Sequence, residues 1–132
     1  MERPIIRYVP QRHEGDCAVA CLAMMTGVSY EQSLIAFGKQ DPQVCKRGAW
    51  TYQMREAAKL LGFQTTARRK FDLESDHGIL SVKFKEVSHE HVVVLWEGRI
   101  IDTDFGLYMA DVYFSVMKAR PTSLLVVDKA EG

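Results

Sequence analysis

The sequence has no apolar run close to the ~20 residues that a membrane-spanning helix needs. Its N-terminus also lacks the long apolar segment of a secretory signal peptide. Lys and Arg together number 17, as do Asp and Glu, so the basic excess with which nucleic-acid binders neutralise phosphates is missing. We therefore expect a cytoplasmic protein that binds neither membranes nor nucleic acids.

Cysteine and proline are both scarce. There are three cysteines and four prolines in 132 residues, and there are no repeats and no linker rich in Pro or Ser. An odd number of cysteines in a chain expected in the cytosol indicates free thiols rather than a disulfide framework. With 47% hydrophobic residues, the length suits a single domain over residues 1–132 with one core.

The first half of the chain has helical patterns. Asp16 is expected to cap a helix that ends at Gly27, and the Ser29–Gln32 pair is typical of a capping box at the start of the next helix. The expected helices cover residues 17–26, about 30–37, and about 50 or 51 to 61, with a loop over 39–49.

Strand patterns follow Gly62. A Glu97–Gly98 turn is expected to join two of the strands into a hairpin. The expected strands are 63–67, 78–84, 91–96, 99–102 and 124–127, with a turn or short helix at 110–117. Helices followed by strands predict an α+β fold, in which N-terminal helices pack on a C-terminal antiparallel sheet.

Cys17 is the first residue after the expected cap of an apolar helix. Unpaired amides give a helix N-terminus a partial positive charge, which favours the thiolate form of a cysteine placed there. A neighbouring imidazolium would complete a thiolate–imidazolium pair. The alternative for any free cysteine is a buried apolar role. We assign that role to Cys21, and we place Cys45, in a polar loop, at the surface.

Two histidines compete for the role of the base. His89 and His91 are two residues apart, so they would face the same side of a strand. His91 directly precedes the apolar run 92–95, and it therefore opens a buried strand, where a base is held rigidly. We favour His91 and place His89 at the rim, whereas His13 and His77 are expected in exposed loops.

Asp102 ends the strand that returns from the hairpin towards His91. A carboxylate that accepts the imidazole N–H would fix the tautomer and stabilise the charged ring, and Asp104 is the alternative for this role. Gln11 stands six residues before Cys17. Its side-chain NH₂ could donate to a developing oxyanion, with the Cys17 backbone N–H as the second donor.

These motifs resemble those of the double-glycine leader peptidases, which are papain-like peptidases that process bacteriocin leader peptides. They also resemble the motifs of the stand-alone relatives of that family. The resemblance spans about residues 5–106, and the matching residues are Gln11, Asp16-Cys17, Ala20–Met24, His91–Leu95, Asp102 and Gly106. It departs at Ala18, where the family often has Gly, and at Thr103, where the family has the Pro of an Asp-Pro pair. No transporter or ATPase segment follows, so a stand-alone relative is expected.

The resemblance implies a papain-like fold and a thiol hydrolase that acts on a peptide or protein substrate and needs no cofactor. In the implied arrangement Cys17 is the nucleophile, His91 the base and acid, Asp102 the orienting carboxylate and Gln11 the oxyanion donor. An acyltransferase or a deamidase would use the same machinery, and an inactive binding module would keep the fold, so these alternatives stay open.

A metal site is a hypothesis of another class. Cys17, Cys21, His89 and His91 supply two thiols and two imidazoles, which are typical zinc ligands. Their Cys-x₃-Cys and His-x-His spacings differ from the usual zinc-finger pattern. We therefore expect no bound metal.

Overall fold

The computed structural model describes residues 6–39, 43–44, 49–85 and 90–130. The helices α1 (Cys17–Thr26), α2 (Tyr30–Gly38) and α4 (Thr51–Leu60) come first in the chain. The strands β1 (Phe63–Arg68), β2 (Gly78–Phe84), β3 (Glu90–Trp96), β4 (Arg99–Asp102) and β5 (Gly106–Met109) follow, and the helix α5 (Ala110–Met117) precedes the last strand, β6 (Ala119–Lys129).

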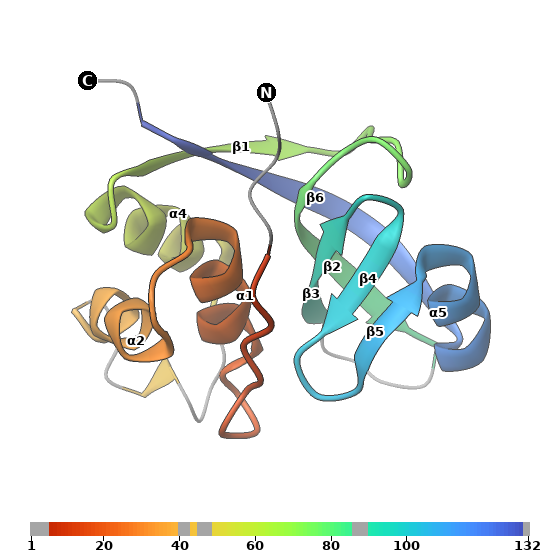
Figure 1. Cartoon of the computed structure of the whole chain (residues 1–132), viewed down its shortest axis with the longest axis horizontal. Coiled ribbons are helices and arrows are strands. Elements are labelled where there is room, and N and C mark those ends of the chain that lie inside the picture. Colours follow the sequence, from red (N-terminus) through yellow and green to blue (C-terminus); the bar gives the residue numbers. More distant parts are fainter. Residues whose placement is uncertain (1–5, 40–42, 45–48, 86–89, 131–132) are drawn as a thin grey trace.

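The six strands form one antiparallel sheet in the order β1-β6-β2-β3-β4-β5. Helices α1, α2 and α4 lie on one side of the molecule, strands β2 to β5 with α5 lie on the other, and the long strand β6 passes both groups (Figure 1). This arrangement confirms the predicted α+β fold with N-terminal helices packed on an antiparallel sheet.

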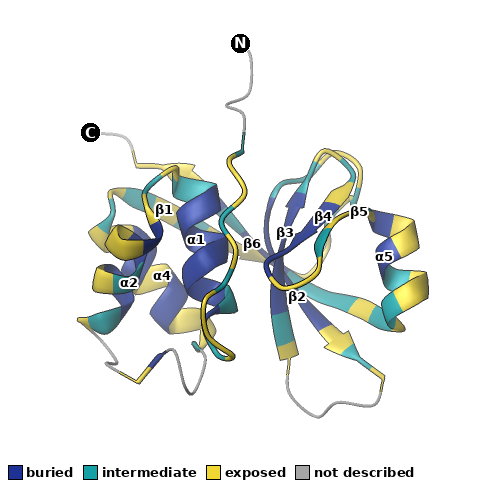
Figure 2. Ribbon diagram, turned by 60° about the horizontal axis from the view of Figure 1, so that its bottom comes forward, coloured by how far each residue is buried: buried dark blue, intermediate teal, exposed yellow. Residues whose placement is uncertain are grey.

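The sheet separates two clusters of buried side chains, because successive residues of a strand face opposite sides. Val92 and Val94 of β3 pack with the helices α1, α2 and α4. Val93 and Leu95 of the same strand pack with Tyr113 of α5. Helix α1 is apolar nearly all round and is buried along most of its length (Figure 2), as its sequence predicts.

The predicted hairpin between β3 and β4 is confirmed. Glu97 and Gly98 both have positive φ, 50° and 74°, as the two central residues of a type I′ turn do. Val94 pairs with Ile101 and Trp96 with Arg99. This register places the last residue of β4 next to the beginning of β3, which is where the site is built.

Two features of the sheet differ from the prediction. Strand β5 was not expected, and it pairs with β4 only after the tight connection that follows Asp102. Strand β6 begins at Ala119 rather than near residue 124. Its first half contains Arg120 and Pro121 and lacks an apolar pattern, so pairing with β2 around a bulge, and not local propensity, makes it a strand.

Candidate active site

Cys17 is the first residue of α1 and is partly exposed. The helix begins where the sequence predicts, and it ends at Gly27, whose φ of 78° and N–H···O bond to Ala23 form the expected left-handed cap. The thiol therefore stands at the positive end of a helix, at the start of the segment that is otherwise buried in the core.

The predicted capping role of the Asp16 side chain is wrong. Asp16 occupies the N-cap position, but its side chain makes no cap bond to α1. The buried carboxylate instead accepts the backbone N–H groups of Arg12 and His13 and the hydroxyl of Tyr30. Asp16 thus ties the preceding loop to α2, and its side chain does not cap the amides at the start of α1.

His91 is the second residue of β3, and its side chain is 16% exposed. Its Nε2 lies 3.3 Å from Oδ1 of Asp102, and the ring is close enough to the side chain of Cys17 for the two to interact electrostatically. Since Nε2 faces Asp102, Nδ1 is the nitrogen left for the thiol. The structure therefore brings together a thiol, an imidazole and a carboxylate that the sequence holds far apart.

The surroundings of His91 favour its charged form. Burial by itself would lower the pKa of the imidazole, but the hydrogen bond to Asp102 and the electrostatic interactions with Cys17 and Asp102 raise the pKa of His91 to about 10. The ring also packs against Phe84, with 5.7 Å between the ring centroids. At neutral pH the arrangement therefore favours an imidazolium beside Cys17.

Asp102 is fully buried, and four groups donate to its carboxylate. Oδ1 accepts from His91 and from the backbone N–H groups of Asp104 and Phe105, and Oδ2 accepts from the Tyr113 hydroxyl at 2.7 Å. Burial alone would raise the pKa of Asp102, but the bonds from His91 and Tyr113 lower it. A buried carboxylate held this way stays ionised beside the imidazole.

Gln11 lies in the loop before α1. Both the oxygen and the NH₂ of its side-chain amide form hydrogen bonds within the protein. Its Oε1 accepts the hydroxyl of Thr103 at 2.7 Å, and its Nε2 donates to the carbonyl of His13 at 2.9 Å. The Gln11 backbone N–H also donates to the Thr103 carbonyl at 3.1 Å. One N–H of the amide is thus used inside the protein, and the second is left for another acceptor.

Two residues of this site were not identified from the sequence. Tyr113 comes from α5 and bonds to Asp102, and Thr103 holds Gln11. A tyrosine in a short helix carries no local signal for such a role. Thr103 lies in the turn after β4, and its bond to a loop 92 residues away has no local signal either.

The side chains of Cys21, His13 and His77 are not part of this triad. Cys21 is fully buried, its thiol contacts the carbonyl of Val92, and burial raises its pKa well above the usual range, so its core assignment agrees with the structure. His13 is exposed as expected, but His77 is partly buried and its ring packs edge-to-face on Trp96.

The proposed zinc ligands are only partly described. Of the four, His89 lies outside the described residues, as does Cys45, which was expected at the surface. Among the residues that are described, no three His, Cys, Asp or Glu side chains are grouped closely enough to hold a metal ion. No helix in the described ranges is both long and apolar enough to cross a bilayer.

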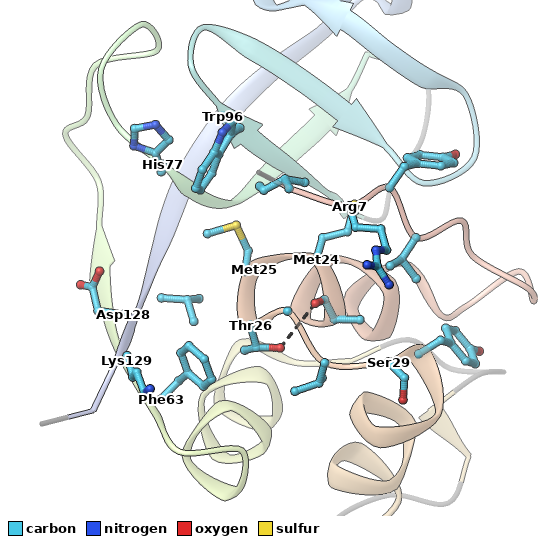
Figure 3. Close-up of a pocket in the computed structure, with 18 of the residues that line it drawn as sticks. Arg7, Met24, Met25, Thr26, Ser29, Phe63, His77, Trp96, Asp128 and Lys129 are labelled. Carbon is cyan, nitrogen blue, oxygen red and sulfur yellow. Dashed lines mark hydrogen bonds between the residues drawn. The ribbon is translucent and has the colours of Figure 1, made fainter. Parts of the chain in front are cut away.

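A pocket of about 1140 Å³ lies at the other end of α1 (Figure 3). Met25 and Thr26 line it together with Phe63, Trp96 and Arg7. Thr26 is at the opposite end of α1 from Cys17, and about nine residues at 1.5 Å each place the two helix ends more than ~10 Å apart. None of Cys17, His91 and Asp102 lines this pocket, so it is not part of the candidate active site.

Comparison with known proteins gives structural likeness only. No protein-family model and no curated protein matches the sequence. The double glycine motif protease of an AMS/PCAT transporter, solved in complex with its leader peptide, is 18% identical with a TM-score of 0.66, over 96% of this chain and 93% of that one.

Two peptidase domains of ComA are also similar. That of Streptococcus ComA, a bifunctional ABC transporter of a quorum-sensing pathway, is 24% identical with a TM-score of 0.64, over 93% of this chain and 99% of that one. That of Streptococcus mutans ComA is 21% identical with a TM-score of 0.53, over 90% and 98%. This chain therefore has the papain-like fold of the double-glycine peptidase domains of ABC transporters.

Proposed function

We propose that this chain is a cysteine hydrolase that cleaves a peptide or amide bond through a thioester acyl-enzyme. The observation that carries the proposal is the grouping of Cys17, His91 and Asp102, in which the imidazole bonds to the carboxylate at 3.3 Å and interacts with the Cys17 side chain. It joins the first residue of a helix to a buried carboxylate at the end of a hairpin. The fold shared with peptidase domains, one of them bound to its leader peptide, supports a peptide as substrate.

Acylation uses the thiolate of Cys17 as the nucleophile. Its sulfur forms a bond to the carbonyl carbon, and the electron pair of the carbonyl moves onto the oxygen. The Cys17 backbone N–H and the second N–H of Gln11 donate to this oxyanion. The carbon–nitrogen bond then breaks as the imidazolium of His91 gives its proton to the departing amine.

Deacylation reverses the role of His91. The ring is now neutral, and it takes a proton from a water molecule that attacks the thioester carbonyl. The carbon–sulfur bond breaks, Cys17 leaves as the thiolate and the product leaves as a carboxylic acid. Asp102 stays ionised throughout and keeps the Nε2–H of His91 directed away from the sulfur.

A cleavage assay tests the proposal without knowledge of the substrate. A library of peptides from a digested proteome is incubated with the protein, and new termini are identified by mass spectrometry. We expect cleavage at a limited set of sequences. The matched control is the same protein treated with iodoacetamide until Cys17 is alkylated, which we expect to cleave nothing because the nucleophile is blocked.

Other outcomes separate the alternatives. New termini that persist after alkylation would contradict the proposal. Conversion of glutamine to glutamate in the peptides would indicate a deamidase, in which ammonia leaves instead of a peptide amine. Transfer of peptide acyl groups to an added amine at the expense of water would indicate an acyltransferase. One zinc per chain by elemental analysis would favour the metal site.

A further inference from the structure

Thr103 connects two segments that lie 92 residues apart in the sequence. It directly follows Asp102 at the end of β4, and it is 2% exposed. Its hydroxyl donates to Oε1 of Gln11 at 2.7 Å, and its carbonyl accepts the Gln11 backbone N–H at 3.1 Å. The same carbonyl lies 3.3 Å from the hydroxyl of Tyr8. A buried threonine therefore holds both the backbone and the side chain of Gln11.

The hydrogen bonds determine which end of the Gln11 side-chain amide is the oxygen and which is the NH₂. The carbonyl of His13 can only accept a hydrogen bond, so the amide group 2.9 Å from it must be the NH₂. The oxygen then faces Thr103, and the threonine hydroxyl must be the donor in that bond. Rotation of the amide by half a turn would place two acceptors together at His13.

This orientation decides whether Gln11 can stabilise an oxyanion. With the oxygen held by Thr103, the NH₂ has one N–H on His13 and one left to donate. A rotated amide would present a lone pair instead, and a lone pair repels a developing negative charge. Without a hydroxyl at position 103, the amide oxygen loses this hydrogen bond, and of the two bonds that hold the side-chain amide the one to the His13 carbonyl remains.

We propose that Thr103 is a positioning residue that, together with the His13 carbonyl, holds the Gln11 amide in its donor orientation in the oxyanion hole. This role rests on the proposed hydrolase function. Asp102 and Thr103 are consecutive in the chain, and one bonds to the imidazole while the other bonds to the oxyanion donor. The end of β4 thus orients the base and the oxyanion hole together, through two adjacent side chains.

The test compares Thr103→Val, which keeps the shape but removes the hydroxyl, with Thr103→Ser, which keeps the hydroxyl. The acylation of Cys17 by p-nitrophenyl acetate is followed as the burst of nitrophenolate, because this step forms an oxyanion. Loss of a whole oxyanion donor costs about 10²-fold or more, and we expect Thr103→Val to lose about 10-fold or more of the acylation rate. We expect Thr103→Ser to acylate close to the wild-type rate.

Alkylation by iodoacetamide is the matched measurement on the same variants. It uses the same thiolate, but sulfur displaces iodide and no oxyanion forms. We therefore expect Thr103→Val to be alkylated at the wild-type rate at Cys17. An equal loss in both reactions would mean that the substitution disturbs the fold or the thiolate, and it would overturn the proposed role.

A second arm uses Gln11 itself. If Thr103 acts through Gln11, the valine substitution should cost nothing further in a Gln11→Ala background, because the two residues form one unit. An undiminished effect in that background would overturn the role, as would a Thr103→Val variant that acylates at the wild-type rate. A wild-type protein that gives no burst at Cys17 would refute the hydrolase function itself, a result distinct from either of these.

Discussion

Replacement of Cys17 by alanine is expected to reduce hydrolysis to the uncatalysed background, a loss on the order of 10⁴-fold or more. The reason is that every bond-making step of the proposed reaction passes through this sulfur, and the remaining groups can only bind and polarise the substrate. The rate of p-nitrophenyl acetate hydrolysis measures the loss, and mass spectrometry shows whether an acetyl group is found on the protein.

Cys21→Ala is the matched control for this substitution. Cys21 lies one helical turn further along α1, is fully buried and has its thiol against the carbonyl of Val92. Burial raises its pKa, so it stays a thiol and does not attack. We expect this variant to hydrolyse the ester like the wild type. Acetylation of the Cys17→Ala protein at Cys21 with retained turnover would contradict the assignment of the nucleophile.

The second large effect is expected for Asp102→Asn, with a loss of about 10²- to 10⁴-fold in kcat. The substitution keeps the size of the side chain. The amide oxygen can still accept the backbone N–H groups of Asp104 and Phe105, and the amide NH₂ can donate to the Tyr113 hydroxyl. What disappears is the negative charge beside His91, so the imidazolium and its orientation lose their support.

Asp104→Asn separates this effect from a general change of charge. Asp104 was the alternative carboxylate, but its side chain is exposed and only its backbone N–H reaches Asp102. We expect this variant to keep wild-type kcat, and we expect thermal unfolding to show both variants folded at the assay temperature. A loss of the same size in Asp104→Asn would show that Asp102 has no special role.

The features that could be predicted from the sequence are those with a local signal. The apolar run of α1, the capping box of Ser29 and Gln32 and the Glu97–Gly98 turn each need only neighbouring residues, and each is confirmed. The turn also fixes the register of β3 and β4, which is why the closeness of His91 and Asp102 could be predicted before the whole fold was known.

The features that could not be predicted depend on partners distant in the sequence. Asp16 has the composition of a cap, yet it accepts from Arg12, His13 and Tyr30, because the loop amides and a hydroxyl compete successfully for its carboxylate. The hydroxyl of Tyr113 reaches Asp102 only because α5 packs on the sheet. Such roles follow from tertiary packing, which no residue pattern encodes locally.

The central claim is that Cys17 and His91 form a charged pair in the folded protein. The most direct measurement is a pH titration of the ring nitrogens of His91 by ¹⁵N NMR, in the wild type and in Cys17→Ala. In the wild type the surroundings raise the pKa of His91 from 6.5 to about 10, so the ring should remain doubly protonated at pH 8. Without the thiolate its pKa should fall. A wild-type ring that is neutral at pH 8, or a pKa unchanged by the loss of Cys17, would contradict the account.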